Sequence, residues 1–403
     1  MRAVEGKSIV LGVCGGIAAY KCVELLRLLR QAGAEVRVMM TANATRFVGT
    51  VTFEALSGYA VCTDLFRGSD AAIRHIEWAQ EADAVVVAPA TANMVGKLSR
   101  GIADDALSTF MLAVTAPVLV CPAMNTHMYQ HPAVQRNLAR LASYGHRVLA
   151  PDTGELACGT TGPGRLPAPQ RIFDALVELV TPQDFEGRRL LVTAGPTREF
   201  LDPVRFVSNP SSGKMGFAIA QAARQRGARV TLVTGPVVLA DPPGVETVRV
   251  QSAAEMAEAV LGRLPDVDIV IKSAAVSDYR PTDRMAHKMK KGPAEITLKL
   301  ARTQDILREI GRRKSGQFVV GFAAETRELE KYGEQKLVSK NLDMIAVNRV
   351  GTSDSGFEAD TNRLTLLFRD GRRERLPLMA KEDLAHCLLD HVLARITAQN
   401  GDR

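Results

Sequence analysis

Short apolar runs alternate with longer helical patterns along the whole chain. In the first half, runs rich in β-branched residues predict strands at residues 8–13, 36–40, 84–90, 117–123 and 147–150. Between them, apolar residues at helical spacing predict helices, for example at residues 18–31 and 92–100. This alternation is typical of a parallel sheet with helices on both faces.

The same alternation restarts after residues 181–187 (TPQDFEG), a polar segment with Pro and Gly that we expect to separate two domains, 1–181 and 182–403. In the second half the pattern predicts strands at 190–193, 229–234, 269–273, 318–322, 344–347 and 364–368, and a helix from 381 to about 398. The predicted fold is α/β, with two doubly wound (Rossmann-like or flavodoxin-like) parallel-sheet domains. Because such sheets bind ligands beyond the carboxyl ends of their strands, the loops there should carry the chemistry.

Composition narrows the class of protein. The 403 residues are 46% hydrophobic and 24% charged, which excludes a disordered, collagen-like or coiled-coil chain. The net charge of +7 lies mostly in the second half, and aromatic residues make up only 5%. Few aromatics argue against stacked single-stranded nucleic acid, whereas a small ligand rich in phosphate fits the basic surplus. Six cysteines without a CxxC motif, and no uncharged stretch of about 18 residues, predict a soluble cytoplasmic protein.

Three segments of the first half follow predicted strands. Residues 12–21 (GVCGGIAAYK) open a helix and can hold a phosphate at its N-terminus, although a glycine turn there is as often plain loop geometry and the segment is not GxGxxG. Residues 89–93 (PATAN) and 121–125 (CPAMN) each bring an asparagine, Asn93 and Asn125, to the same edge. Their amides can hydrogen-bond a ring or a carboxylate.

Two more residues are candidates for acid–base catalysis. His75 lies in residues 73–78 (IRHIEW). A single histidine in such a segment is more often an ordinary surface or core-edge residue than a functional one. Cys158 lies in residues 157–165 (ACGTTGPGR), which are too glycine-rich for a regular element and suggest a mobile flap that carries a thiol. A zinc site at Cys121, His127 and His131 would lack a fourth ligand, so the metal ligands remain unknown.

In this order and spacing, GGIAAYK, His75, PATAN, PAMN and ACGTTGPGR resemble the FMN-dependent cysteine decarboxylases, in particular the phosphopantothenoylcysteine decarboxylases. The resemblance implies that Cys158 is the proton donor, that His75 is a catalytic base or positioning group, and that Asn125 holds the substrate carboxylate. It implies that the flavin contacts are Gly15, Ile17, Thr41, Thr91, Asn93 and Ser108. Flavin oxidation of the CH₂–SH group would create the electron sink that the decarboxylation needs.

The second half has comparable loops. Residues 208–216 (SNPSSGKMG) precede an apolar helix, where they can bind an anion or simply cap the helix through Ser211 or Ser212. Residues 273–279 (SAAVSDY) place Asp278 after a strand. Residues 287–292 (HKMKKG) form either a solvated face or a loop that closes over phosphates. Residues 321–326 (GFAAET) are followed by Lys336 and Lys340, which share a helix face.

These segments resemble bacterial phosphopantothenate–cysteine ligase over residues 189–350, and the two halves together resemble the fused bifunctional enzymes of coenzyme A biosynthesis. The resemblance implies CTP as co-substrate with Mg²⁺, an acyl-cytidylate intermediate, and catalytic roles for Asn209 and Lys288. It implies that the substrate contacts are Arg205 (across a subunit interface), Asn209, Ala274 and Ala275. It implies that the nucleotide contacts are Ser273, Ala274, Asp278, Lys288, Lys290, Asp305, Phe322, Lys336 and Lys340. Gln304 departs from the family's usual proline, which affects only a local turn.

Two other classes of function remain open. A flavodoxin-like binding or regulatory protein would lack catalytic residues, but His75, Asn125 and Cys158 are all present. A dinucleotide-dependent oxidoreductase would carry GxGxxG with a distal acid, which is absent from the sequence. The expected partners are the small-molecule substrates 4′-phosphopantothenate, cysteine and CTP, without nucleic acid or membrane. By resemblance, trimeric contacts of the first domain and dimeric contacts of the second would build a homo-oligomer, possibly a dodecamer.

Overall fold

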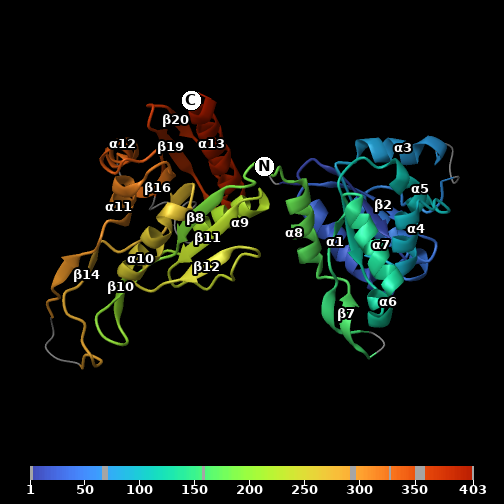
Figure 1. The fold of residues 1–403 in the computed structure, drawn as a ribbon, viewed down its shortest axis with the longest axis horizontal. Helices are drawn as coiled ribbons and strands as arrows, with labels where there is room; N and C mark the ends of the chain where they lie inside the picture. The colour runs from blue at the N-terminus through green and yellow to red at the C-terminus, as the bar shows by residue number, and fades with distance from the viewer. Residues whose placement is uncertain are drawn as a thin grey trace. The chain divides into compact units, whose positions relative to one another are not determined.

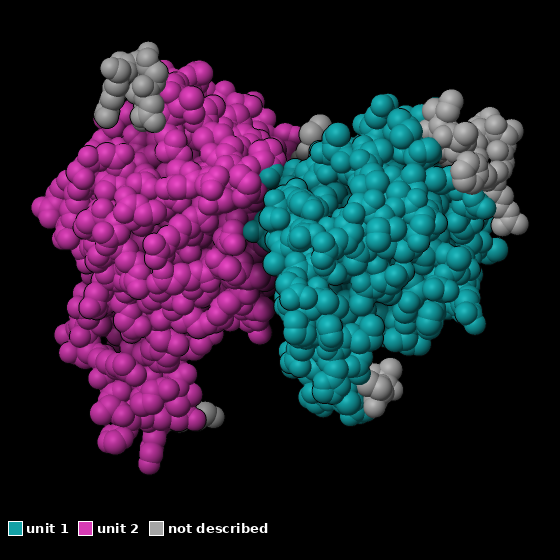
Figure 2. Space-filling model, turned by 45° about the vertical axis from the view of Figure 1, so that its right-hand side comes forward, with its two compact units in different colours: residues 1–181 teal, residues 182–403 magenta. Residues whose placement is uncertain are grey.

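The computed structural model describes residues 3–65, 71–156, 159–290, 296–325, 328–349 and 359–401. The chain forms two compact units, Met1–Thr181 and Pro182–Arg403, which are shown as a ribbon in Figure 1 and in separate colours in Figure 2. Each unit is described by itself below. No helix in the described residues is long and apolar enough to cross a membrane.

Unit 1 (Met1–Thr181) has a five-stranded, fully parallel sheet in the order β2-β1-β3-β4-β5. The five strands lie where the apolar runs predict them, and their ends differ from the prediction by at most two residues: β1 Ser8–Val13, β2 Glu35–Met40, β3 Ala84–Ala90, β4 Val118–Pro122 and β5 Arg147–Val148. Its helices are α1 Lys21–Gln31, α2 Thr50–Ser57, α3 Ala71–Glu81, α4 Ala92–Arg100, α5 Ala106–Ala113, α6 Thr126–Gln130, α7 Pro132–Ser143 and α8 Pro169–Val180.

Helices cover both faces of this sheet. Because successive side chains of a strand point to opposite faces, Ile9 and Leu11 of β1 belong to the core under α1, α2 and α8. Val10 of the same strand belongs to the other core, formed with α4, α5 and α7. The doubly wound arrangement predicted from the sequence is therefore confirmed in unit 1.

The glycine-rich segment of unit 1 contains a hairpin that the sequence pattern did not predict. Strands β6 (Asp152–Glu155) and β7 (Thr161–Arg165) pair in antiparallel fashion. The hairpin lies against the loop after β4, where the Met124 N–H donates to the Gly164 carbonyl over 3.0 Å. Ala157 and Cys158 lie outside the described residues.

Unit 2 (Pro182–Arg403) has an eight-stranded sheet in the order β12-β11-β8-β13-β16-β17-β19-β20. Its first six strands are parallel, and β19 and β20 add an antiparallel edge that the prediction of a parallel sheet did not include. The strands are β8 Arg189–Ala194, β11 Arg229–Thr234, β12 Glu246–Arg249, β13 Ile269–Lys272, β16 Phe318–Glu325, β17 Met344–Arg349, β19 Leu364–Phe368 and β20 Arg373–Arg375.

Two hydrophobic cores again enclose the sheet. Helices α9 (Lys214–Gln225) and α13 (Lys381–Gly401) pack against each other on one core, and α10 (Ala253–Arg263), α11 (Ile306–Arg313) and α12 (Leu329–Ser339) contribute to the other. The six parallel strands follow the order 3-2-1-4-5-6, so the winding reverses between β8 and β13. A crevice at this switch point is where such sheets bind ligands.

Short strands extend from the body of unit 2. The pairs β9–β10 (Arg198–Phe200, Phe206–Ser208) and β14–β15 (Tyr279–Pro281, Leu300–Arg302) form a projecting arm, marked in Figure 1 by the labels β10 and β14. We use "arm" below for these four strands and their connections. A further pair, β18 (Thr361–Asn362) and β21 (Met379–Ala380), joins two segments near the start of α13.

Candidate functional site

In unit 1, candidate flavin-binding residues meet at the carboxyl edge of the sheet. Gly15, Thr41 and Thr91 each follow one of three neighbouring strands, β1, β2 and β3. A Cβ atom on Gly15 would lie 2.4 Å from Cβ of Asn43, so only glycine permits this approach of the two loops. Thr91 caps α4 by accepting a hydrogen bond from the Met94 N–H. The edge therefore offers hydroxyl groups and backbone N–H groups at the β1–β3 switch point.

The remaining flavin candidates differ in exposure. Ile17 is 64% exposed and Asn93 is also exposed, which leaves both accessible to a ligand. Ser108 is buried, and it forms a capping box with Asp105 at the start of α5. The geometry thus accounts for Ser108 as a helix cap without invoking a ligand.

His75 and Asn125 occupy different structural settings. The Nδ1 atom of His75, on α3, is buried without a hydrogen-bond partner among the described residues. Such an atom is costly unless a ligand or water satisfies it. Asn125 follows β4 and caps α6, with its side-chain oxygen accepting from the His127 N–H at 2.8 Å. The unpartnered His75 atom and the approach at Gly15 both fit a bound flavin, which would be held beside neutral groups.

Burial argues against a metal-binding thiolate at Cys121. This cysteine is fully buried in β4, and desolvation raises the pKa of its thiol well above the usual value. A thiol that keeps its proton at neutral pH is a poor zinc ligand, because the metal binds the thiolate.

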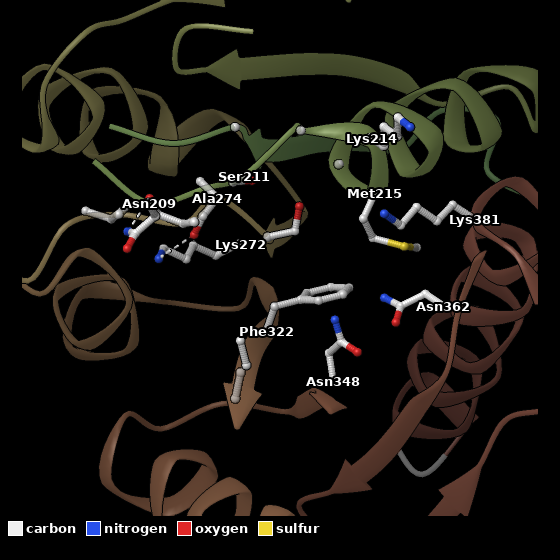
Figure 3. A pocket seen from close by; sticks show the side chains of 18 of the residues that line it. Asn209, Ser211, Lys214, Met215, Lys272, Ala274, Phe322, Asn348, Asn362 and Lys381 are labelled. Carbon is white, nitrogen blue, oxygen red and sulfur yellow. Dashed lines mark hydrogen bonds between the residues drawn. The ribbon is translucent and has the colours of Figure 1, made fainter. Parts of the chain in front are cut away.

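In unit 2, a cavity of about 400 Å³ opens at the carboxyl ends of β8 and β13 (Figure 3). We call it the acyl cavity, after the substrate that the sequence leads us to expect there. Six of the predicted residues line it: Asn209, Ser273, Ala274, Ala275, Asp278 and Phe322. The first turn of α9 is pressed against this edge, since a Cβ atom on Gly216 would lie 2.5 Å from Cβ of Ala194. The tertiary fold therefore brings three sequence motifs to one cavity.

Hydrogen bonds hold the loop after β13 in place. The Ser273 hydroxyl donates to the Thr193 carbonyl at 2.8 Å, and the Ala274 N–H donates to the Thr193 hydroxyl at 3.1 Å. The Asn209 side-chain amide donates to the Ala275 carbonyl at 3.0 Å. These bonds fix the wall of the acyl cavity to strand β8.

A second cavity, of about 490 Å³, shares Lys272, Val276 and Asp278 with the first. We call it the nucleotide cavity, again after the ligand expected from the sequence. It is also lined by Asp305 and Lys340, whose charged groups lie 3.0 Å apart. Partial burial disfavours the charged form of Asp305, but the Arg308 N–H and the Lys340 and Lys272 ammonium groups together lower its pKa. The cavity thus combines fixed charges of both signs.

Lys272 is a site residue that the sequence reasoning missed. It ends β13, lines both cavities and donates to the Ala274 carbonyl at 3.1 Å. Burial, and then the nearby Lys340, lower the pKa of its ammonium group to about 8. A single lysine at the end of the apolar run IVIK was the only signal in the sequence.

Lys288 and Lys290 of the HKMKKG segment lie elsewhere. Lys288 and Lys290 are exposed and, in the described structure, lie outside the lining of both cavities, as does Lys336 on α12. The backbone between the first two is tethered, because the Met289 N–H donates to Asp202 and the Met289 carbonyl accepts from Arg205.

Asp202 organises this tether. Its buried carboxylate accepts from the backbone N–H groups of Val204 and Arg205 and from the Arg205 guanidinium at 3.0 Å. Desolvation alone would raise the pKa of Asp202, but these bonds and the one from Met289 lower it to about 2. Arg205 is therefore held beside the lysine segment and outside the lining of the acyl cavity.

Sequence reasoning also missed residues at the other end of the acyl cavity. Asn348, Asn362 and Lys381 line it there, and each belongs to a segment that no motif singled out. Asn348 belongs to β17, whereas the positions of Asn362 and Lys381 depend on the pairing of β18 with β21, which a local pattern does not reveal.

Each half of the chain matches a family of known proteins. A family model described as "Flavoprotein" matches residues 1–181, and one described as "DNA/pantothenate metabolism flavoprotein C-terminal domain" matches residues 185–396. The coenzyme A biosynthesis bifunctional protein CoaBC of Bacillus subtilis (strain 168) is 49% identical over 405 residues, which cover 99% of this chain and 100% of that protein.

The corresponding protein of Escherichia coli (strain K12) is 47% identical over 404 residues, 99% of each chain. The crystal structure of the C-terminal domain of a CoaBC protein is 44% identical, with a TM-score of 0.47, and covers 54% of this chain and 99% of that one. With two family models that together span nearly the whole sequence and full-length relatives above 45% identity, the chain belongs to the family of coenzyme A biosynthesis bifunctional proteins.

Proposed function

We propose that the two activities of this bifunctional coenzyme A biosynthesis enzyme are divided between its units. Unit 1 is the FMN-dependent phosphopantothenoylcysteine decarboxylase, and unit 2 is the CTP-dependent phosphopantothenate–cysteine ligase. The observation that carries the division is the pair of adjoining cavities in unit 2. They share Lys272 and Asp278, so a nucleotide in one cavity can meet an acyl substrate in the other.

The ligase reaction requires an activated carboxylate. The carboxylate of 4′-phosphopantothenate attacks the α-phosphorus of CTP, pyrophosphate leaves, and the cysteine amine then displaces CMP to form the amide. Lys272 and Lys340 place positive charge near the phosphates, and Asp278 and Asp305 face the nucleotide cavity. Asn209 and the backbone at Ala274 and Ala275 hold the acyl-cytidylate in the acyl cavity.

Other residues complete the ligase site. Phe322 lines the acyl cavity, and Ser273 holds the wall that it faces. Lys288, Lys290 and Lys336 reach the nucleotide when the site closes, Arg205 binds the substrate phosphate of a second subunit, and Mg²⁺ neutralises the remaining phosphate charge.

The decarboxylase reaction uses the neutral edge of unit 1. Bound FMN would oxidise the cysteinyl CH₂–SH group, which gives the electron sink for loss of CO₂. Gly15, Ile17, Thr41, Thr91 and Asn93 would hold the flavin, whereas Ser108, a buried helix cap, would support the loop before α5. Asn125 would orient the substrate carboxylate, and His75 would accept or position a proton through its unpartnered Nδ1 atom. Cys158 would then protonate the enethiol, and return of the two electrons held on the flavin would give 4′-phosphopantetheine and the oxidised cofactor.

Mass analysis of products tests both activities at once. Incubation of the enzyme with 4′-phosphopantothenate, cysteine, CTP and Mg²⁺ should yield 4′-phosphopantetheine, CO₂, CMP and pyrophosphate. Omission of CTP should abolish all products, whereas supplied phosphopantothenoylcysteine should still be decarboxylated. Absence of both reactions in a folded, flavin-loaded enzyme would contradict the proposal.

Assembly and location follow as further parts of the proposal. The arm of unit 2 exposes large apolar side chains, which suits a dimer contact: Val204, Phe206, Val207, Tyr279 and Leu300. Together with trimeric contacts of unit 1, such dimers would form a dodecamer in the cytoplasm. Light scattering gives the mass of the assembly directly, and a monomer at micromolar concentration would contradict this part.

A further inference from the structure

Helix α3 carries His75 toward the carboxyl edge of the unit 1 sheet. Because α3 lies in the crossover between the parallel strands β2 and β3, it runs opposite to them, and its first turns lie where the strands end. Its other end is anchored to β1: the Ser8 N–H donates to the Asp83 carboxylate at 2.8 Å, and the Asp83 N–H donates to the Ser8 carbonyl at 2.8 Å. His75 therefore lies on the part of the helix that is farther from this anchor.

The packing of α3 sets the position of the His75 ring. No hydrogen bond from the described residues holds its Nδ1 atom. The helix packs against α5 (Figure 1) and contributes Trp78 and Ala79 to the core formed with α4, α5 and α7. Trp78 is 9% exposed and follows His75 by three residues, so the two side chains lie on one face of α3, about one turn apart. A contact that holds Trp78 therefore holds His75 as well.

Arg37 makes such a contact from the edge strand β2. Its guanidinium carbon is 5.5 Å from the centre of the Trp78 ring and 6.0 Å from the centre of the Tyr59 ring, which follows α2. Both distances are within the range of a cation–π interaction. The same guanidinium pairs with the Glu81 carboxylate at 2.6 Å, one turn farther along α3. We call Arg37, Trp78 and Glu81 the α3 clamp, because together they tie the helix to the edge of the sheet.

The aromatic contact is the stronger part of the α3 clamp. The Glu81 side chain is 56% exposed, and ion pairs at such sites contribute little because water screens them. The Arg37 side chain is only 20% exposed, so its guanidinium is partly desolvated beside the rings, where a cation–π interaction is stronger. Loss of Arg37 should therefore loosen α3 at Trp78, close to His75, more than at its anchored end.

We infer that Arg37 is a positioning residue for His75, because the α3 clamp fixes where the imidazole meets the reacting atoms. The inference rests on the decarboxylase function proposed for unit 1 and adds a residue that none of the roles above includes. A catalytic group gives its full rate only when it is held close to the productive geometry, and a displacement of about 1 Å that originates far from the reacting atoms lowers the rate by about 100-fold. Arg37 acts in this way without contact with the substrate.

The test is a double-mutant cycle on decarboxylation of supplied phosphopantothenoylcysteine by the full-length, FMN-loaded enzyme. Release of CO₂ from a radiolabelled carboxylate is measured for the wild type, Arg37→Met, His75→Asn and the double variant. Arg27→Met is the matched control, since it removes the same charge from an exposed pair with Glu24 on α1. The rate of ligation and the FMN content of each protein show whether the variants remain folded.

We expect Arg37→Met to lower kcat for CO₂ release by about 10- to 100-fold, the effect of displacing a reacting group by about 1 Å. The KM for phosphopantothenoylcysteine should stay within about twofold of the wild type, because Arg37 acts through His75 and not on the substrate. In the His75→Asn background, the same change should lower kcat by less than about twofold, since the group that Arg37 positions is gone. Arg37→Lys, which keeps a cation beside the rings, should stay within about threefold of the wild type. Arg27→Met should behave as wild type.

The fluorescence of Trp78 reports the position of α3 directly, because it is the single tryptophan of the chain. Its emission should move to longer wavelength in Arg37→Met, since the indole loses the side chain that covers it. The emission of Arg37→Lys and Arg27→Met should match that of the wild type. An unchanged emission maximum in Arg37→Met would contradict the α3 clamp.

The cycle separates a failure of the inference from a failure of the proposed function. Equal losses of kcat in both backgrounds would make Arg37 a structural residue, and wild-type kcat in Arg37→Met would refute its role while leaving the decarboxylase function intact. A raised KM with unchanged kcat would place Arg37 at the substrate instead. A folded, FMN-loaded wild type that releases no CO₂, or a His75→Asn enzyme with wild-type kcat, would refute the function proposed for unit 1, and the inference with it.

A milder variant keeps the test decisive if Arg37→Met does not fold. Glu81→Gln removes only the exposed partner of the α3 clamp and takes the place of Arg37→Met in the cycle. We expect it to lower kcat by about two- to threefold, the range for an exposed ion pair, and to have no effect beside His75→Asn. The same loss in both backgrounds would overturn the inference.

Discussion

The two units share a doubly wound architecture but differ in the charge that they place at the switch point. The edge of unit 1 is built from Gly15, Thr41, Thr91 and the neutral amide of Asn125. In unit 2, the nucleotide cavity is lined by Lys272, Lys340, Asp278 and Asp305. Lys214 and Lys381 line the acyl cavity beside it. The fold supplies the position, and the loops supply chemistry suited either to a flavin or to phosphates.

The proposed division of the two reactions between the units gives this contrast a physical reason. A decarboxylation through an electron sink gains from a site that does not stabilise the starting carboxylate too strongly, so neutral donors suffice. Nucleotidyl transfer concentrates negative charge on several phosphate oxygens, which fixed cations must stabilise in a partly desolvated site. Burial lowers the pKa values of Lys272 and Lys381 in unit 2, so their charged forms carry a stability cost.

The largest effect should come from the thiol of unit 1. We expect Cys158→Ser to allow flavin reduction and CO₂ loss, but to lower the formation of 4′-phosphopantetheine by about 10³-fold, within the range that general acids contribute. The oxidised enethiol should accumulate, as mass analysis would reveal. Wild-type turnover by this variant would remove Cys158 from the mechanism, and ligation serves as its internal control.

The next effect should be confined to unit 2. We expect Lys288→Gln to slow ligation by on the order of 10²-fold or more, the effect of removing one donor that stabilises transition-state charge. Decarboxylation of supplied phosphopantothenoylcysteine should be unchanged. A few-fold effect would mean that the HKMKKG segment is only a solvated face, and loss of both activities would indicate a structural role.

Substitution of Lys272 should change both the rate of ligation and the stability of the fold. We expect Lys272→Met to lower kcat/KM for CTP by about tenfold, through loss of one charged contact. The same change should raise the free energy of unfolding at pH 7 by at most about 3.5 kcal/mol, since the pKa falls from 10.5 to about 8 and a pKa unit corresponds to about 1.4 kcal/mol.

The contribution of Lys272 to the free energy of unfolding changes with pH in a definite direction. The pKa of Lys272 falls from 10.5 to about 8 on folding, so the unfolded chain binds more protons between these values. Titration of Lys272 therefore raises the free energy of unfolding as the pH increases from about 8 to 10.5. This rise should be smaller in Lys272→Met. Chemical denaturation at pH 7, 9 and 10 measures it, and identical curves for the two proteins would contradict a buried ammonium.

Asp202 should give the smallest effect on activity. We expect Asp202→Asn to loosen the Met289 tether and to slow ligation a few-fold, with no change in decarboxylation. Folding lowers the pKa of Asp202 from 3.8 to about 2, so its contribution is present above about pH 4 and is lost as the pH falls toward 2. Acid unfolding monitored by circular dichroism should show less pH dependence in this window for the variant, and an unchanged acid transition would argue against this role.

Sequence predicted those parts of the fold that local pattern determines. Strands such as β1 and β11 have the predicted bounds because each is a buried, β-branched run between turn residues. The strands of the arm were missed because three residues show no periodicity. The antiparallel direction of β19 was also missed, since an apolar run does not encode which neighbour it pairs with.

The residues of the unit 2 site likewise fall into those that the sequence identified and those that it missed. Asp278 could be found because it follows a predicted strand, whereas Asn209 and Ser273 were identified through the resemblance to the ligase family. Asn362 and Lys381 lie beyond residue 350, where the resemblance to the ligase ends, and the β18–β21 pair brings them to the cavity. Residues that depend on such long-range pairing are the ones that sequence alone does not reveal.

The most direct measurement of the divided chemistry is a product analysis of the full-length His75→Asn enzyme with 4′-phosphopantothenate, cysteine, CTP and Mg²⁺. We predict that phosphopantothenoylcysteine accumulates at the wild-type rate of ligation while CO₂ release falls by about 10²-fold or more. Loss of ligation together with decarboxylation, in a variant that remains folded and assembled, would contradict the assignment of one reaction to each unit.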